Sequence, residues 1–368
     1  MSSTSLERVQ AAFNHVTPDR TPIFEYLLFG KRAEDILGHA FADYTYDLPQ
    51  WNDYVQHTGL EQALKDYAKN RIELALKLGH DLLYVCPNPL PNAEYVYDPL
   101  VQVDDYFTIH STEDPVERLQ LRNEKVQQTL MKKLPEACYD VFVRMQSEMA
   151  NKGIELPLFA PAYFHGIWND VDLMQTILLD PNVAHTHFSL ATTRAKLIID
   201  DYYDNGIFLI GIGGDFAGNR PLISPETYRE FIVPEVRILA DYVKAKGGFP
   251  INATDGNIWS VIDDFIIGCN VDGYMEIDAG AGMSLSKLKK AYGEVVVLMG
   301  NMDCGNTLTY ATPEGITVKT HEILDAGYGN GGHIFTASNA ITESIPLKNY
   351  MAMVNAYREH FSLKPVEW

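Results

Sequence analysis

Acidic side chains, one thiol and one amide follow short apolar runs in the second half of the chain. The residues are Asp215, Asp255, Glu276, Cys304 and Asn339. Continuous apolar runs of this length are typical of strands that are buried on both faces. Carboxylates and thiols transfer protons or bind zinc, and an amide holds a substrate by hydrogen bonds. These residue types therefore predict acid–base or metal chemistry, provided that the fold brings them together.

Each of these residues also has a structural interpretation. Asp255 precedes Gly256 and could cap the helix that follows, because aspartate is a common N-cap residue. Cys304 could be a small buried apolar side chain. Asp215 and Asn339 could serve only to shape turns. Glu276 is harder to explain in this way, because it lies within the strand-like run YMEID, where an unpaired carboxylate is costly.

Aromatic residues follow an earlier apolar run, LPLFAPA (156–162), and also the run that ends at Asp215. Aromatic rings form either core packing or the wall of a pocket for a flat substrate. A histidine satisfied by structural hydrogen bonds is the alternative interpretation of His165. The expected substrate-binding residues are Tyr163, Phe164, His165, Trp168, Asp215 and Phe216.

Strand-like and helix-like segments alternate along most of the chain. The eight expected strands are 20–28, 81–87, 156–162, 207–215, 249–255, 271–278, 294–304 and 333–339. This alternation predicts an α/β fold of the (β/α)8 TIM-barrel type, as one domain over residues 1–368. An open doubly wound sheet is the alternative, but no GxGxxG motif opens a helix after a strand.

The residues beyond a minimal barrel lie in the N-terminal half. We expect N-terminal helices and an inserted hairpin at 92–114, after the second strand. Further on, Ser224 and Pro225 should begin a helix over 224–248 that is kinked at Pro234, and a second helix should cover 257–269. A barrel carries its active site at the carboxyl ends of its strands, which is where the acidic residues and the thiol stand.

Composition excludes several classes of function. The formal net charge of −20 disfavours binding to nucleic acids and anionic membrane surfaces. The N-terminus has no signal-peptide pattern, and no apolar run approaches the roughly 20 residues of a membrane span. Four cysteines without a CxxC pair predict reduced thiols and a cytoplasmic protein.

Four separated segments carry a resemblance to a known family. They are GGDFAGNRPLISPETYREFIVPE (213–235), NATDGN (252–257), YGEVVVLMGNMDC (292–304) and NAITESIPLKNYMAM (339–353). In order and spacing they resemble the uroporphyrinogen decarboxylase superfamily, and the similarity extends from about Arg8 to Phe361. The resemblance implies a (β/α)8 barrel. It also implies one of two activities: cofactor-free decarboxylation of a porphyrinogen, or methyl transfer to a corrinoid on a separate protein.

At the positions that distinguish these two branches, this chain differs from the decarboxylase. The arginine-rich segment of that enzyme corresponds to FEYLLFG (24–30), its pyrrole-binding aspartate falls near Asn88, and its histidine aligns with Asn339. The zinc motif of thiol-methylating relatives falls on Ala253, Asp255 and Asn339, so it is absent as well.

The ether-cleaving relatives resemble this chain better, and they imply zinc ligands from the later strands. By this resemblance Glu276, Cys304 and Asp255 would bind zinc, and Asp255, Glu276 and Asn339 would be catalytic. Zinc or a proton donor would neutralise the leaving oxygen. The expected partners are a corrinoid protein, a small methyl donor such as a methoxylated aromatic, and a second copy of the chain. The alternatives are a decarboxylase and a non-catalytic binding module.

Overall fold

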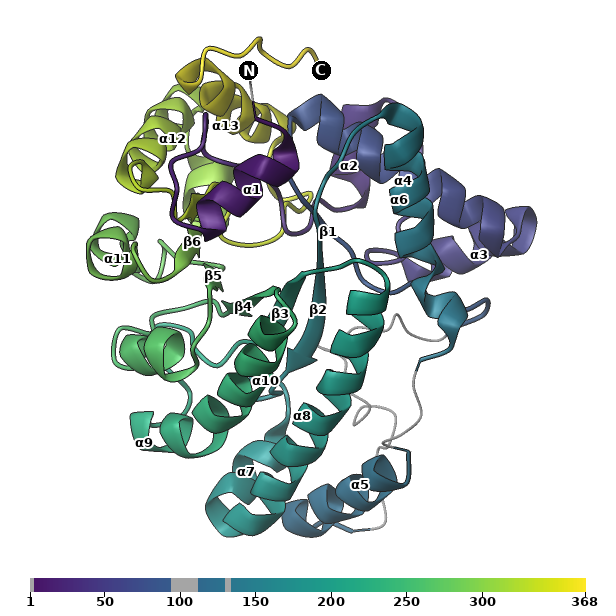
Figure 1. Cartoon of the computed structure of the whole chain (residues 1–368), viewed down its shortest axis with the longest axis vertical. Helices are drawn as coiled ribbons and strands as arrows, with labels where there is room; N and C mark the ends of the chain where they lie inside the picture. The colour runs from purple at the N-terminus through teal and green to yellow at the C-terminus, as the bar shows by residue number, and fades with distance from the viewer. Residues whose placement is uncertain (1–2, 94–111, 130–133) are drawn as a thin grey trace. The chain divides into compact units, whose positions relative to one another are not determined.

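The computed structural model describes residues 3–93, 112–129 and 134–368 (Figure 1). The strands form a seven-stranded sheet in the order β1 to β7, and the printed pairings within it are parallel. Their bounds are β1 Leu83–Tyr84, β2 Leu158–Phe164, β3 Leu209–Gly213, β4 Phe249–Ala253, β5 Gly273–Met275, β6 Val297–Met299 and β7 His333–Ile334. The predicted α/β fold is therefore confirmed as TIM-barrel-like.

Helices lie between the strands and precede the first of them, as the sequence predicts. Their bounds are α1 Ser5–Phe13, α2 Gly30–Leu37, α3 Leu48–Thr58, α4 Leu60–Leu78, α5 Pro115–Thr129, α6 Asp140–Lys152, α7 Val171–Leu179, α8 Pro181–Asp204, α9 Pro225–Thr227, α10 Val233–Ala245, α11 Leu285–Tyr292, α12 Pro313–Gly327 and α13 Leu347–His360. Most of the predicted hairpin at 92–114 lies outside the described residues. In the described part of the chain, no helix combines the length and the apolar character needed to cross a bilayer.

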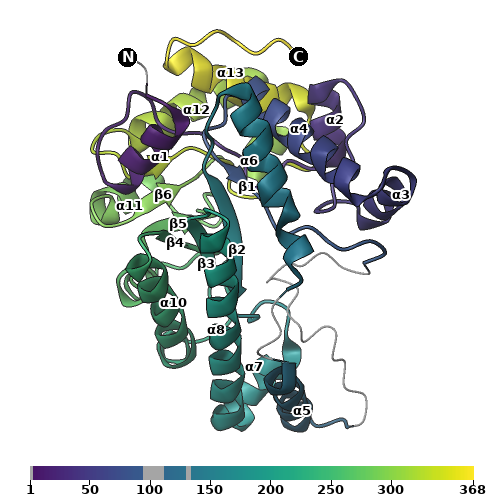
Figure 2. The same ribbon diagram turned by 45° about the vertical axis from the view of Figure 1, so that its right-hand side comes forward.

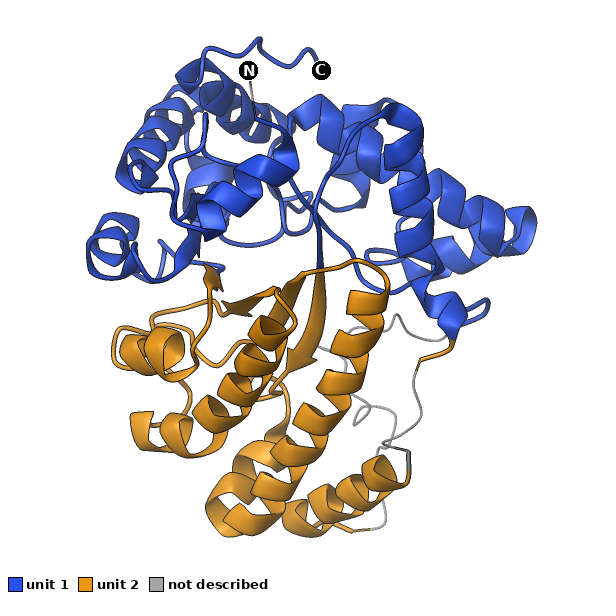
Figure 3. Cartoon of the chain, in the orientation of Figure 1, with its two compact units in different colours: residues 1–97, 136–159, 275–368 blue, residues 98–135, 160–274 orange. Residues whose placement is uncertain are grey.

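The chain divides into two compact units (Figure 3). The first unit comprises residues 1–97, 136–159 and 275–368, and the second comprises 98–135 and 160–274. Strand β2 passes from the first unit into the second, and β5 passes back. In the second unit α8 and α10 lie side by side (Figure 2). The single domain expected over residues 1–368 stays a prediction.

The first predicted strand, 20–28, is irregular. Its backbone makes isolated parallel bridges: the Phe24 amide donates to the Phe335 carbonyl at 3.2 Å, and the Phe335 amide donates to the Pro22 carbonyl at 2.8 Å. On its other side, the Asp81 amide donates to the Ile23 carbonyl at 2.7 Å. Pro22 has no N–H, which interrupts a regular ladder. This segment therefore lies where an eighth strand was expected, but without continuous strand pairing.

One helix prediction is confirmed with a local distortion, and another needs correction. The predicted helix 224–248 starts as expected, since the Ser224 hydroxyl accepts from the Thr227 amide, and it continues to Ala245 through a π-helical turn at Tyr228–Ile232 that joins α9 to α10. Pro234 cannot donate a backbone hydrogen bond, which explains the π-helical turn just before it. The predicted helix 257–269 is shorter than expected: residues 262–263 are α-helical and continue into a π-helical turn at Asp264–Gly268. Its many β-branched residues disfavour a longer helix.

A buried network fixes the N-terminal part of the first unit. The carboxylate of Asp81 is fully buried and contacts Arg8 at 2.6 Å and Arg20 at 2.7 Å. It also accepts from the Ser5 hydroxyl at 2.9 Å and from the Ile23 amide at 3.1 Å. One side chain thus joins α1, the loop after it and the segment 20–28.

Replacing Asp81 with alanine should lower the free energy of unfolding by about 3–5 kcal/mol, because the half-buried Arg20 would lose its counter-ion and the buried Arg8 would keep only Asp19. Urea denaturation of the wild type and the variant measures this change. The control is Glu61→Ala, which removes an exposed ion pair with Lys65 and should change stability little. Equal effects of the two substitutions would contradict the structural role of Asp81.

Candidate functional site

Glu276 directly follows β5 in the first unit and has an unusual backbone conformation. Its φ angle is +65°, and its side chain is buried. A non-glycine residue in this left-handed region costs roughly 1–2 kcal/mol. Such strain persists only where the surroundings hold the residue in place, and it is frequent at functional sites. This supports the interpretation that Glu276 has a specific role.

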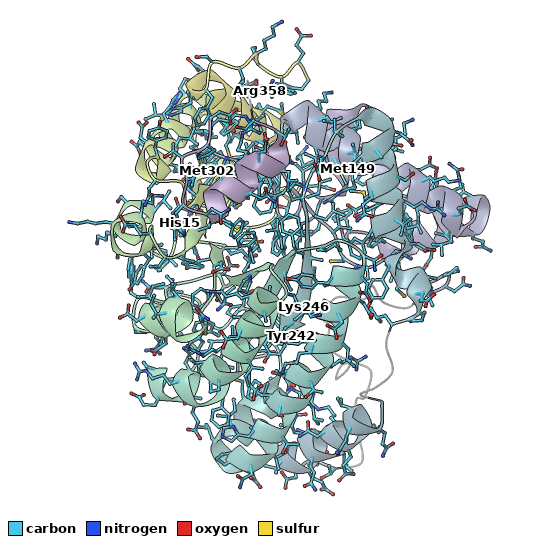
Figure 4. All side chains as sticks on the ribbon, in the orientation of Figure 1. His15, Met149, Tyr242, Lys246, Met302 and Arg358 are labelled. Carbon is cyan, nitrogen blue, oxygen red and sulfur yellow. The ribbon has the colours of Figure 1, made fainter. Side chains whose placement is uncertain are left out.

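Cys304 and Asn339 lie together at the carboxyl ends of β6 and β7. The Cys304 thiol donates to the Asn339 carbonyl at 3.2 Å, and the Cys304 amide donates to the Ser338 hydroxyl at 3.3 Å. Met302, labelled in Figure 4, joins the same two strand ends, because its carbonyl accepts from the Ser338 amide at 2.8 Å. The structure therefore brings together two of the predicted site residues.

Asp303 explains how the chain turns away after β6. Its carboxylate accepts from the amides of Gly305 at 2.9 Å and Asn306 at 3.1 Å, as an N-cap of the π-helical turn Cys304–Leu308. This cap fixes the backbone that carries Cys304. The residues directly before and after Cys304 are thus joined by hydrogen bonds, which limits the movement of the thiol.

Glu25 lies close to Cys304 and was missed by the sequence analysis. Its side chain is 5% exposed. One carboxyl oxygen accepts from the Thr336 hydroxyl and the Ala337 amide, each at 3.2 Å. The other oxygen has no hydrogen-bond partner among the described residues. Burial raises the pKa of Glu25 to about 8, so the carboxyl group is mostly uncharged at neutral pH.

Glu25, Cys304 and Tyr350 form a cluster that we call the buried polar cluster. Burial, and then the charge of Glu25, raise the pKa of the Cys304 thiol to about 12. The Tyr350 hydroxyl, on α13, is buried without a hydrogen-bond partner among the described residues. Burial and the nearby Glu25 and Cys304 raise its pKa well above the usual value. At neutral pH all three groups therefore carry protons.

Glu25 could have been found from the sequence. It stands in the apolar run PIFEYLL, as Glu276 stands in YMEID. A carboxylate inside a strand-like apolar run is costly unless it has a purpose. The same reasoning that singled out Glu276 applies to Glu25. Tyr350 gives no comparable signal, since a tyrosine on the buried face of a helix is ordinary packing.

In the second unit, Asp215 and Asp255 are in direct contact. The Asp255 amide donates to the Asp215 carboxylate at 2.8 Å, and burial raises the pKa of Asp215. These residues follow β3 and β4, whose ends are adjacent because the strands pair in parallel. Gly214 lets the chain turn closely here: a Cβ atom at this position would lie 1.9 Å from the ring of Phe164.

Several predicted substrate residues form an aromatic cluster in the second unit. The Phe164 and His165 rings stack at 5.6 Å, and His165 meets Phe216 edge-on at 5.9 Å. His165 is buried, its Nδ1 accepts from the Ile167 amide, and burial lowers its pKa to about 3, so the ring is neutral. Tyr163 is also buried, whereas Trp168 is 54% exposed. Substrate binding by these residues stays a prediction.

The predicted zinc ligands are divided between the units. Glu276 and Cys304 belong to the first unit, and Asp255 belongs to the second. Among the residues that the structure describes, no three His, Cys, Asp or Glu side chains form a group able to hold a metal ion. Without a metal, burial keeps the Cys304 thiol protonated, and it donates a hydrogen bond; zinc would bind this sulfur with loss of that proton. Zinc at these residues stays a prediction.

Comparisons with known proteins agree with the fold and the resemblance. A family model described as uroporphyrinogen decarboxylase (URO-D) matches residues 169–360, more than half of the chain. Curated proteins named uroporphyrinogen decarboxylase match as well: one from Chlorobium phaeovibrioides is 27% identical over 190 residues, and one from Coxiella burnetii is 28% identical over 195 residues. These matches cover 49% and 51% of this chain and 50% of each relative, so the chain spans about half the length of the curated relatives it matches.

One solved structure is similar over nearly the whole chain. It is a methyltransferase from Methanosarcina mazei, with a TM-score of 0.66 and 16% sequence identity, and the match covers 97% of this chain and 98% of that one. At this identity the likeness shows a shared fold.

The pKa of Glu25 predicts how stability depends on pH. The folded protein keeps a proton on Glu25 that the unfolded chain loses above about pH 4.5, so the contribution of Glu25 to stability should fall as the pH rises from about 4.5 to 8. The slope is about 1.4 kcal/mol per pH unit within this range. Glu25→Gln does not titrate, so its stability relative to the wild type should increase with pH and level off above about pH 8.

Urea denaturation at several pH values between 4.5 and 9 tests this expectation. Glu61→Gln, at an exposed position, serves as the control and should show no comparable trend. A stability difference between Glu25→Gln and the wild type that stays constant over this range would contradict a buried, protonated Glu25.

Proposed function

The chain belongs to the uroporphyrinogen decarboxylase (URO-D) family, and from this premise we propose that it is a methyltransferase. It takes the methyl group from a small methylated donor, most simply a methyl ether such as a methoxylated aromatic. The acceptor is the cobalt(I) of a corrinoid carried by a separate protein. Two observations carry the proposal: Glu276 is buried in a strained backbone position after β5, and in the buried polar cluster Glu25 and Cys304 are kept protonated.

The chemistry of ether cleavage explains why protonated groups are useful. The bond between the methyl carbon and oxygen breaks, and its electron pair stays on oxygen. The cobalt electron pair forms the new bond to carbon, so the cobalt is formally oxidised from I to III. An alkoxide or phenoxide is a poor leaving group, so the oxygen must receive a proton as the bond breaks. The acceptor supplies the nucleophile, and this chain needs only to hold the donor and deliver the proton.

Residues that can deliver a proton or position the methyl donor are present in the first unit and in the second. In the first unit Glu25 and Glu276 can act as acids, and the Cys304 thiol and Asn339 can orient the donor by hydrogen bonds. In the second unit the partly buried Asp215, with a raised pKa, is held beside Asp255. Glu276 is favoured as the acid because it is buried in a strained backbone position directly after a strand.

Zinc is the alternative means of neutralising the oxygen. Glu276 and Cys304, with Asp255, are the residues that would hold it, and as a Lewis acid it would stabilise the developing negative charge. Metal analysis separates the two routes. Stoichiometric zinc whose removal abolishes methyl transfer supports the zinc route, and full activity after chelation supports the acid route.

Decarboxylation of a porphyrinogen is the second candidate, and the names of the curated relatives favour it. Against it, the segment FEYLLFG contains none of the arginines that bind the carboxylates of such a substrate in the decarboxylase. Incubation with uroporphyrinogen under anaerobic conditions gives a direct answer. Formation of coproporphyrinogen, without demethylation of any ether, would overturn the methyltransferase proposal.

The main test is an anaerobic assay with a methoxylated phenol and a reduced corrinoid protein. We expect loss of the cobalt(I) absorbance, together with one equivalent of the free phenol for each methylated corrinoid. Neither change should occur without this protein. Absence of demethylation across a panel of ethers and small methylated donors would contradict the proposal.

Substitutions at the site should lower kcat strongly if they remove the proton donor. Glu276→Gln is expected to lower kcat by about 10²–10⁴-fold, as is usual for loss of a general acid. Cys304→Ser keeps a hydroxyl donor and should lose less activity under the acid route than under the zinc route. The matched control is Cys138→Ser, which replaces another buried free cysteine in the first unit. Unchanged kcat in Glu276→Gln would remove this residue from the mechanism.

A further inference from the structure

Two histidines face each other on the helices α12 and α13 of the first unit. Figure 1 shows these helices side by side. His321 lies in α12 and His360 ends α13, two residues after Arg358, which is labelled in Figure 4. Their Nδ1 atoms are 3.1 Å apart, and both side chains are half-buried. Neither residue belongs to the site described above.

This separation of the nitrogens suits two ligands of one metal ion. Zinc–imidazole bonds are about 2.0–2.1 Å long, so two nitrogens 3.1 Å apart subtend an angle of about 95–102° at a shared metal. That angle lies between those of octahedral and tetrahedral coordination. Without a metal, a proton on one nitrogen joins the pair by an N–H···N hydrogen bond. The ring centroids are 5.3 Å apart, so the two nitrogens point almost directly at each other, and each ring must tilt by about 40° to direct its lone pair at a shared metal.

A carboxylate stands next to this pair. Asp325 follows His321 by four residues on α12, and its oxygen is 3.8 Å from Nε2 of His360. Its side chain is 74% exposed and is therefore free to rotate. Ligating histidines usually have a carboxylate near their second nitrogen. The net charge of −20 also raises the local concentration of cations.

We propose that His321 and His360 form a transition-metal site that clamps α12 to α13. The two imidazole nitrogens are the protein ligands, water completes the coordination, and Asp325 supports it. No third ligand among the described residues is already in place, so this is a two-nitrogen site that takes Zn²⁺, Ni²⁺ or Cu²⁺ rather than Mg²⁺ or Ca²⁺.

The clamp would act on the helix that carries Tyr350 of the buried polar cluster. The Asn349 side chain, also on α13, donates to the Leu308 carbonyl at 2.8 Å, and Leu308 is the last residue of the turn that begins at Cys304. A metal that fixes α13 against α12 therefore stabilises this region of the first unit. The inference does not depend on methyl transfer, because it rests on residues outside the proposed catalytic site.

The test uses full-length protein treated with EDTA and then titrated with ZnCl2. Calorimetry gives the affinity and the stoichiometry, and thermal unfolding gives the change in Tm. All variants are also made in a Cys304→Ser background, so that zinc at the candidate active site cannot account for the result. We expect one zinc ion per chain in this background, a higher Tm with zinc, and no such change with MgCl2.

The histidine variants decide the outcome. His321→Gln and His360→Gln should each weaken zinc binding at least tenfold and abolish the increase in Tm. His57→Gln, at an exposed histidine on α3, is the matched control and should behave as the parent protein. With Cu²⁺, the electron paramagnetic resonance spectrum should show coupling to two imidazole nitrogens. The same zinc affinity in the parent and in both histidine variants, or no effect of zinc on the parent, would leave only a hydrogen-bonded pair and would overturn the proposal.

Discussion

The buried carboxylate of Asp81 needs positively charged partners inside the protein, and the N-terminal part of the first unit is organised around this requirement. A fully buried charge is tolerated only when it is paired and hydrogen-bonded. Arg8 and Arg20 provide the charges, and the Ile23 amide provides a further donor. Because Ile23 is fixed in this way, the irregular segment 20–28 has a defined position. That position places Glu25 two residues further on, where Thr336 and Ala337 can donate to it.

The acidic groups of the first unit differ in kind from the surface charges. Most of the acidic residues that give the net charge of −20 are ordinary solvated carboxylates, whereas burial favours the neutral form of Glu25 and Cys304. These two groups also oppose each other's ionisation, since two negative charges in one buried region repel. The buried polar cluster is therefore a set of proton donors. Reactions that end with a poor leaving group on oxygen need such donors.

Much of the architecture follows from strand order alone. Parallel strands that follow one another in a sheet put their carboxyl ends side by side, which is why Cys304 and Asn339, and also Asp215 and Asp255, are neighbours. Packing decided the features that the sequence did not reveal. The sequence indicates where regular structure is disfavoured, at Pro22, at Pro234 and among the β-branched residues of 257–269, but not which backbone hydrogen bonds form there instead. Glu25 was visible in the sequence, but its partners lie too far along the chain to be inferred from local spacing.

The bond between Thr336 and Glu25 joins residues 311 positions apart, and this separation has a consequence for synthesis. A ribosome makes Glu25 early and Thr336 late, so the carboxyl group remains hydrated, and therefore ionised, while most of the polypeptide is being translated. Contacts between such distant positions give a high contact order, which slows folding. The N-terminal segment therefore cannot complete its contacts until the last strand has been synthesised. During that interval its apolar residues stay exposed and can aggregate or bind chaperones.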